Sequence, residues 1–325
     1  MTIQITPTGV VVKGNLEYLR KEFDRNHCVL LPKFLDPALL KPIQSQIVRS
    51  RFFRVKQKDG TSIESRMMRN PALALLQVLT NDPWLFKRVE NITGCKQTEY
   101  FDGRVYRFVP GEGHRHFWHD DDVHGRMIAM SINLSTDIYS GGILQIRDSK
   151  TKKIYHKVAN VGFGDAILFR IHDRLEHRLT AVTGTMAKVS YAGWFRSRLN
   201  YQSFLRKKLV QLNENSHGDV KIETNGGNQQ SVRLNGRVSL GQNLVYRILG
   251  EDMFIFDVER GLFYKLDSIG TRLWSAILKN GRLQNILALM KSEYDADPKI
   301  LKRDILDLVQ RLHQQGLVNL WNGAA

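Results

Sequence analysis

The sequence predicts an α+β chain of two domains: an antiparallel barrel or jelly roll preceded by helices, and then a small winged-helix-like domain. Short strand patterns separated by glycine-containing turns fill residues 104–195, which is typical of a jelly roll. Residues 211–236 are rich in Asn, Gln, Gly and Ser, and three strands followed by three amphipathic helices come after them. We expect a first domain over residues 1–205, a linker over 206–236 and a second domain over 237–325.

The residues before the barrel predict helices with one short strand between them. Residues 15–23 place apolar side chains at helical spacing, and residues 28–32 form a short apolar run that favours a strand. An Asp or Asn followed by Pro marks the start of a helix, because the side chain caps the first turn and Pro fits its first position. This signal occurs three times, at Asp36-Pro37, Asn70-Pro71 and Asp82-Pro83. Residues 49–69 are strongly basic, and we expect a loop there.

The barrel itself is predicted from four apolar or β-branched runs with turns between them. A turn at Pro110–Gly113 follows the first run, and a Gly-Asp turn at residues 162–165 precedes the last. The four runs are residues 104–109, 127–134, 141–146 and 166–171.

A dense group of His and Asp residues lies between the first two runs, over residues 114–122. It contains a His-x-Asp unit, His119 and Asp121. If this unit lies on a strand, its two side chains point to one face, and Asp120 and Asp122 point to the other. An imidazole and a carboxylate on one face can bind one metal ion, and two His and one carboxylate form the facial site of non-heme Fe(II) oxygenases. The third ligand has to come from later in the chain.

Residues 106–195 resemble the catalytic core of the 2-oxoglutarate/Fe(II) dioxygenases, nearest the prolyl 4-hydroxylase-like branch, whose fold is a double-stranded β-helix. The resemblance rests on an ordered series of motif positions. These are Tyr106, Gly111, His119, Asp121, Arg126, Asn133-Leu134, Gly141-Gly142-Ile143-Leu144, Gly164-Asp165, His177 and Lys188.

The resemblance implies the cofactors Fe(II), 2-oxoglutarate and O2, with iron held by His119, Asp121 and His177. His172 is the competing distal ligand, but it stands too far from Lys188 for the pattern of the family. The family holds the second carboxylate of 2-oxoglutarate with a basic residue and a Ser or Thr two positions later. Lys188 and Ser190 match that pair, and two residues apart on a strand they face the same way. Tyr106 is a further co-substrate contact by family position.

The C-terminal residues predict strands at 245–249, 253–258 and 262–266, followed by three amphipathic helices. Ser268 is the expected cap of the first helix, Asp297-Pro298 starts the third, and Gly316 ends it. This order resembles the PqqD-like domain, a peptide-recognition element of enzymes that modify ribosomally made peptides. A generic winged helix, which could bind DNA, is the alternative.

The PqqD resemblance implies that a leader peptide adds a strand to the edge of the small sheet, beside the third helix. By position, the edge is Leu262, Phe263, Tyr264, Lys265 and Leu266, and the helix is residues 298–315. Lys265, Lys302 and Arg303 could contact an acidic leader.

Charge and composition agree with a protein that meets acidic partners. The chain has 325 residues and a formal net charge of +16. Residues 233–325 hold 13 Lys and Arg against 10 Asp and Glu, so most of the surplus lies in the first domain. Only Cys28 and Cys95 are present, so we expect no disulfide framework. No apolar run is long enough to span a bilayer, and the start of the chain lacks a signal-peptide pattern, so we expect a cytoplasmic protein without membrane contact.

Together these features predict a hydroxylase, or other C–H-oxidising enzyme, that acts on a ribosomally made precursor peptide in natural-product biosynthesis. Three alternatives stay open: oxidation of a free amino acid or other small molecule, action on nucleic acid, and a non-catalytic binding protein. The AlkB-type dealkylases carry an Arg-x-Asn-x-x-x-x-x-Arg pattern that is absent after His177, which disfavours nucleic acid. The intact His-x-Asp and distal His disfavour a non-catalytic protein.

Overall fold

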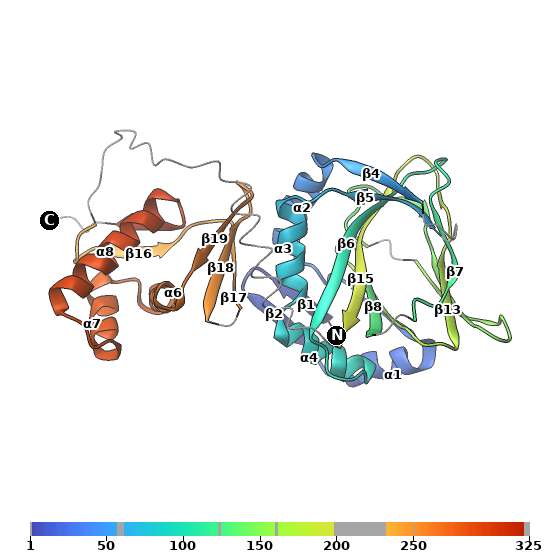
Figure 1. The fold of residues 1–325 in the computed structure, drawn as a ribbon, viewed down its shortest axis with the longest axis horizontal. Helices are drawn as coiled ribbons and strands as arrows, with labels where there is room; N and C mark the ends of the chain where they lie inside the picture. Colours follow the sequence, from blue (N-terminus) through green and yellow to red (C-terminus); the bar gives the residue numbers. More distant parts are fainter. Residues whose placement is uncertain are drawn as a thin grey trace. The chain divides into compact units, whose positions relative to one another are not determined.

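The computed structural model describes residues 2–56, 62–122, 125–159, 162–197, 232–249 and 251–321. The chain divides into two compact units, residues 1–205 and 206–325 (Figure 1). Most of the predicted linker, residues 206–231, lies outside the described residues.

The first unit is built on a nearly closed antiparallel sheet of eleven strands. Its strands pair in the order β11-β10-β13-β7-β5-β6-β15-β8-β12-β3, and β4 pairs with β5. The predicted jelly roll with N-terminal helices is therefore present. The sheet strands are β3 (Cys28–Leu31), β4 (Phe52–Lys56), β5 (Ser62–Met67), β6 (Tyr100–Phe108), β7 (Arg115–His119), β8 (Arg126–Asn133), β10 (Leu144–Asp148), β11 (Ile154–Val158), β12 (Ala166–Arg170), β13 (Leu175–Leu179) and β15 (Lys188–Arg196).

Two small hairpins and four helices complete this unit. The hairpins are β1 (Thr2–Thr6) with β2 (Gly9–Lys13), and β9 (Ser140–Gly141) with β14 (Val182–Thr183). The helices are α1 (Glu17–Asn26), α2 (Pro37–Val48), α3 (Pro71–Thr80) and α4 (Pro83–Thr93). The three predicted Asp-Pro and Asn-Pro starts are confirmed. The side chains of Asp36, Asn70 and Asp82 each accept a hydrogen bond from a backbone N–H in the first turn.

The prediction of a loop over residues 49–69 was wrong, because β4 and β5 pair there as antiparallel strands. β5 also pairs with both β6 and β7, so it joins the two halves of the sheet. The reason for the error is physical. The inward side chains of β5 include Glu64 and Arg66, which line a cavity, so the strand lacks the apolar alternation that usually reveals one.

Aromatic packing on the outer face of the sheet fixes β6 against β15. Phe101 of β6 contacts Tyr191 and Phe195 of β15, with ring centroids 5.6 and 4.7 Å apart. A glycine pair, Gly103 opposite Gly193, makes this packing possible. A Cβ atom on Gly103 would lie 2.4 Å from the Tyr191 ring, so no larger residue fits there without a shift. Tyr191 and Phe195 are thus held on the outer face of β15. Because side chains alternate along a strand, Lys188, Ser190 and Ala192 point to the inner face, toward the cavity.

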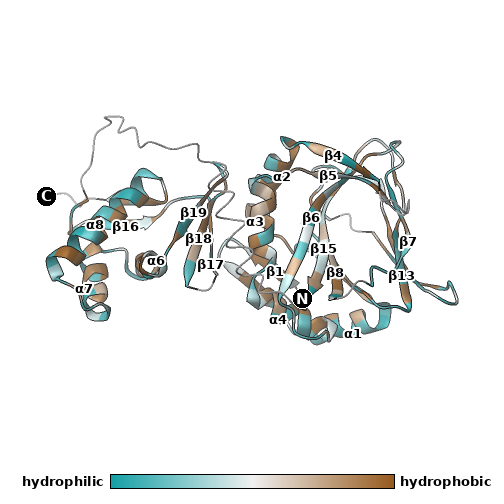
Figure 2. Cartoon of the chain, in the orientation of Figure 1, coloured by the Kyte–Doolittle hydropathy of each residue, from teal (hydrophilic) through white to brown (hydrophobic). Residues whose placement is uncertain are grey.

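The second unit contains the predicted three strands and three helices. The strands β17 (Leu244–Leu249), β18 (Asp252–Asp257) and β19 (Leu262–Leu266) pair in sequence order. The helices are α6 (Ser268–Asn280), α7 (Leu283–Glu293) and α8 (Pro298–Gln314), and Figure 2 shows hydrophilic and hydrophobic residues alternating along them. An additional pair, β16 (Arg237–Leu240) with β20 (Val318–Trp321), joins the two ends of the unit. The expected cap at Ser268 was off by one residue, because Asp267 accepts the hydrogen bond from the Gly270 N–H.

The core of this unit lies between one face of the three-stranded sheet and the helices. Trp274 of α6 is fully buried and packs against Tyr246 of β17, with ring centroids 5.7 Å apart. Ile255 of β18, Ile286 of α7 and Val309 of α8 belong to the same buried cluster. In the part of the chain that is described, none of the helices is both long enough and apolar enough to cross a membrane.

Candidate metal and co-substrate site

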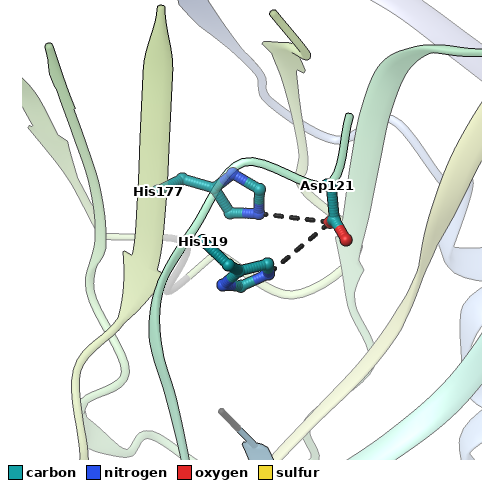
Figure 3. Close-up of side chains that lie close together, drawn as sticks. All are labelled: His119, Asp121 and His177. Carbon is teal, nitrogen blue, oxygen red and sulfur yellow. Dashed lines mark ion pairs between the residues drawn. The ribbon is translucent and has the colours of Figure 1, made fainter. Parts of the chain in front are cut away.

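Two histidines face each other across neighbouring strands of the first unit. His119 ends β7 and His177 lies in the middle of β13, and the two are direct partners in the ladder. Their ring centroids are 4.3 Å apart. Figure 3 shows both rings directed toward the carboxylate of Asp121. His177 is thus the distal histidine of the group. His172 lies in an exposed turn and pairs with Asp173 at 2.6 Å.

Asp121 reaches this group by a different route from the one predicted. β7 ends at His119, so Asp121 does not share a strand face with it. Asp121 instead has a φ of 57°, in the left-handed region that non-glycine residues seldom adopt. Asp121 Oδ2 lies 3.6 Å from His119 Nε2 and 3.3 Å from His177 Nε2. The prediction that Asp120 faces away was also wrong, because Asp120 lines the same cavity as Asp121.

Two further side chains hold the Asp121 carboxylate in place. Arg126 Nη1 donates to Asp121 Oδ1 at 2.8 Å, and Trp194 Nε1 donates to Oδ2 at 2.9 Å. The Arg126 guanidinium also stacks on the Trp194 ring, 3.6 Å from its centroid. Burial opposes ionisation of Asp121, but the neighbouring imidazoles of His119 and His177 hold the pKa of its carboxyl well below the ordinary range.

The three side chains fit a divalent metal ion. One ligand atom of each lies within 4.8 Å of the others, and no other such group occurs among the described residues. His119 Nδ1 is 2.7 Å from the carbonyl oxygen of Phe117, which can only accept, so Nδ1 carries the proton and Nε2 is free to bind a metal. Two imidazoles and one carboxylate, with the remaining positions open to the cavity, are the donor set of a non-heme Fe(II) site.

A cavity of about 470 Å³ extends from this group into the sheet. Lys188 and Ser190 line it from β15, and Tyr106 lines it from β6 directly opposite Ser190. The predicted alternation of Lys188 and Ser190 toward one face is therefore present. All three side chains are buried, and the roles predicted for them in co-substrate binding stay predictions.

Lys188 is a buried cation without a carboxylate partner among the described residues. Its Nζ donates to the Gly142 carbonyl oxygen at 2.8 Å and lies 5.5 Å from the centroid of the Tyr139 ring. Burial lowers the pKa of Lys188 to about 7, because a charged ammonium loses its hydration there. Gly142 has a φ of 58°, and a Cβ atom on it would lie 2.9 Å from Lys188 Cδ, so a side chain at this position would press on the lysine.

No sequence pattern assigned a role to His116, yet it lines the cavity next to His119. The ladder between β7 and β13 contains a bulge, which brings residues three apart to the same side. His116 Nε2 lies 2.5 Å from Glu64 Oε2, and Glu64 Oε1 accepts from Arg66 Nε at 2.5 Å. No local pattern reveals this group, because it depends on a bulge and on a strand that the sequence did not indicate.

His114 is not part of the metal-binding group. His114 is buried, and its Nδ1 accepts a hydrogen bond from the Val109 N–H at 2.8 Å, which closes the turn between β6 and β7. Burial lowers the pKa of His114. His124 lies outside the described residues.

In the second unit, the residues predicted to bind peptide lie on β19 and α8. β19 is an edge strand, since it pairs with β18 alone among the described strands. Tyr264 is partly buried, and its hydroxyl donates to Gln315 Oε1 at 3.4 Å, which links β19 to the end of α8. Lys265 pairs with Asp252 at 3.0 Å and Arg303 with Asp304 at 3.1 Å. Lys302 is exposed and has no ion-pair partner within the described part.

The fold and the three-residue group define a class of protein: a jelly roll with a metal site of two histidines and one carboxylate. Comparison with known families identifies the two parts of the chain further. Residues 103–196 match the 2OG-Fe(II) oxygenase superfamily, and residues 252–318 match coenzyme PQQ synthesis protein D (PqqD). The chain therefore contains a 2OG-Fe(II) oxygenase domain with a His-Asp-His iron triad and a C-terminal PqqD domain. None of the curated proteins matches the chain significantly.

Several solved structures resemble parts of the chain. A prolyl hydroxylase from Trichoplax adhaerens, in complex with a hypoxia inducible factor peptide fragment, is 16% identical and covers 56% of this chain and 88% of its own, with a TM-score of 0.45. A prolyl-4-hydroxylase from Pseudomonas putida is 16% identical over 57% of this chain and 100% of its own, with a TM-score of 0.44. TbiB1 in complex with the TbiA(beta) leader peptide is 23% identical over 27% of this chain and 98% of its own, with a TM-score of 0.24.

Proposed function

We propose that this oxygenase oxidises a C–H bond in a ribosomally made precursor peptide, and that the PqqD domain binds the leader of that peptide. The observation that carries the proposal is that one chain contains both an oxygenase domain and a PqqD domain. One part holds an iron triad beside a cavity, and the other is a PqqD domain with an edge strand and no metal-binding group among its described residues.

The residues of the first unit have separate tasks in this reaction. Iron held by His119, Asp121 and His177 would supply oxidation by O2 coupled to decarboxylation of 2-oxoglutarate to succinate. Arg126 and Trp194 keep the Asp121 carboxylate turned toward the two imidazoles. His177, Lys188 and Ser190 are buried, so the inner part of the site is shielded from water, which protects the reaction from side paths.

Lys188 is proposed to bind the distal carboxylate of 2-oxoglutarate. It lines the cavity, its side chain is buried, and it lacks a carboxylate partner among the described residues. A carboxylate there would form a charge-assisted hydrogen bond and compensate for the lost hydration of the lysine. Ser190 and Tyr106 face each other beside it and can each donate a hydroxyl hydrogen bond to the same carboxylate.

The leader peptide is proposed to pair with β19. An edge strand offers unpaired backbone N–H and C=O groups, so an extended peptide can add to it as a further strand. Lys302 is the strongest of the three predicted basic contacts, because Lys265 and Arg303 already have acidic partners. A bound leader would raise the concentration of the core peptide near the iron without new contacts at the site.

Mass spectrometry of a precursor peptide encoded beside the gene tests the proposal directly. Incubation with the Fe(II)-loaded chain, 2-oxoglutarate and O2 should add an oxygen atom to the core or remove two hydrogen atoms from it, with stoichiometric succinate. Lys302→Glu should weaken leader binding, whereas Lys291→Glu on α7 serves as the matched control and should not. Oxidation of a free amino acid at a higher rate than of any precursor would contradict the peptide assignment.

A further inference from the structure

Among the described residues, each charged side chain that lines the cavity has an oppositely charged partner, except for two cations and one carboxylate. Arg66 pairs with Glu64, and Arg126 pairs with Asp121. Lys188 and Arg104 are the lining cations without a carboxylate partner in the part of the chain that the structure describes. The proposed function assigns the carboxylate of 2-oxoglutarate to Lys188, so the unpaired guanidinium of Arg104 needs a separate explanation.

Arg104 lies on the inner face of β6, at a level between the co-substrate residues and the iron group. The inner stripe of β15 runs from Lys188 through Ser190 and Ala192 to Trp194, which donates to the iron ligand Asp121. Arg104 is the direct ladder partner of Ala192 in this stripe. Since residues two apart on a strand are separated by roughly 6.6 Å, Arg104 stands about one such step from Ser190 and one from Trp194. The guanidinium is exposed and makes no hydrogen bond with any described residue.

The two strands next to Arg104 in the sheet, β15 and β8, carry small side chains at this level. Ala192 pairs with Ser131 of β8, and both line the cavity together with Ala129 and Gly193. Small residues at this level leave space beside the iron that a substrate side chain can enter. The unpaired lining carboxylate, Asp120, follows β7, which is separated from β6 by β5 in the sheet. Its Oδ1 accepts from the Asp122 N–H at 3.0 Å.

We propose that Arg104 binds a carboxylate of the substrate, so that the residue oxidised at the iron is acidic or carries a free C-terminal carboxylate. The inference rests on the proposed function, since it concerns the substrate of the same iron. A guanidinium forms two parallel hydrogen bonds with a carboxylate, which fixes orientation as well as position. Arg104 is the ladder partner of Ala192, one strand step from Trp194, so a carboxylate bound to Arg104 brings the carbons next to it toward the iron group.

Binding of small acidic probes tests this proposal without a known precursor. The probes are N-acetyl aspartate amide and N-acetyl glutamate amide for a side-chain carboxylate, and N-acetyl alanine for a C-terminal carboxylate. Calorimetry with saturating 2-oxoglutarate and Mn(II) in place of Fe(II) keeps acidic probes away from Lys188. At least one acidic probe should bind about tenfold more tightly than the amides of N-acetyl asparagine and N-acetyl glutamine, because the bond to a charged group is lost in those.

Three variants separate the role of Arg104 from general charge. Arg104→Met should abolish the preference for acidic probes, and Arg104→Glu should shift it to N-acetyl lysine amide. Arg107→Met is the matched control on the same strand, because Arg107 faces away from the cavity and stacks on Phe52 at 3.8 Å. This control should keep the preference of the wild type.

The outcomes distinguish this inference from the proposed function. A preference that survives in Arg104→Met, or an absence of acid-specific binding in the wild type, would overturn the inference. Weaker binding of 2-oxoglutarate in Arg104→Met would also overturn it, because Arg104 would then belong to the co-substrate site. Failure of the proposed function would appear elsewhere, as a precursor peptide that is bound but not oxidised.

Discussion

The two ends of the cavity hold charge in opposite ways. At the iron end, Asp121 receives hydrogen bonds from Arg126 and Trp194 and faces two imidazoles, so its charge is compensated by the protein itself. At the other end, the Lys188 ammonium is buried with a carbonyl oxygen and an aromatic ring as its neighbours. This difference shows that the fold itself organises the iron end, whereas we propose that the carboxylate of the co-substrate completes the lysine end.

The largest effect is expected from breaking the iron end. His119→Ala, Asp121→Ala and His177→Ala should each lose bound iron and all succinate formation, because two ligands cannot replace the facial set of three. Metal analysis of the purified variants measures this, and circular dichroism checks that the fold persists. His172→Ala is the matched control. Loss of iron in that variant, with retention in His177→Ala, would show that the distal ligand is wrongly assigned.

Removing the cation tests the other end. Lys188→Met should raise the KM for 2-oxoglutarate by a factor on the order of 10² to 10⁴, since loss of one partner from a buried charged pair costs roughly 3–5 kcal/mol. Iron content should not change, because Lys188 is not among the triad. The exposed lysine variant Lys157→Met provides the control. An unchanged KM would place the carboxylate of the co-substrate elsewhere, with Arg126 as the next candidate.

A smaller effect, on metal affinity, should follow from removing one of the hydrogen bonds that orient the Asp121 carboxylate. Trp194→Phe removes the indole N–H that donates to Asp121 Oδ2 and keeps a ring beneath Arg126. Loss of such an orienting partner typically weakens metal affinity by about 10- to 100-fold. Competition with a chelator measures the metal Kd, and Trp118→Phe, which removes an indole from outside the cavity lining, is the control. Equal Kd values in the two variants would mean that Trp194 only fills space.

The smallest effect concerns pH. Because burial lowers the pKa of Lys188 to about 7, the free lysine loses its proton as pH rises through 7. A bound dianion favours the protonated form, so 2-oxoglutarate should bind more weakly at higher pH, by about fivefold between pH 7 and pH 8. Titration calorimetry of the wild type against Lys188→Met measures this. The variant should show a flat profile, and a parallel slope in both proteins would assign the proton to another group.

The sequence was sufficient for the parts of the fold that carry local signals. The helix starts at Asp36, Asn70 and Asp82 follow from capping chemistry, and the inward stripe of Lys188 and Ser190 follows from the two-residue period of a strand. The set of His119, Asp121 and His177 was predicted because the motifs of a known family occur in the same order in this sequence. None of these depends on contacts that form only after folding.

The features that the sequence did not reveal depend on non-local structure. The sequence did not predict β5, because Glu64 and Arg66 line the cavity at positions where an ordinary strand has apolar side chains. His116 enters the cavity through a bulge, and Asp121 reaches its place through a left-handed backbone rather than strand alternation. The pairing of β16 with β20 joins residues at opposite ends of the second unit, and neither strand carries a local signal for it.

Anaerobic titration of the Fe(II)-loaded protein with 2-oxoglutarate tests most directly the claim that the two ends bind iron and co-substrate together. A 2-oxo acid chelated to Fe(II) gives a visible charge-transfer absorption, so the band reports both ends at once. We predict a saturable band in the wild type, the same band at much higher 2-oxoglutarate concentration in Lys188→Met, and no band in His177→Ala. A wild type without the band, or a Lys188→Met variant with the wild-type midpoint, would contradict this account of the site.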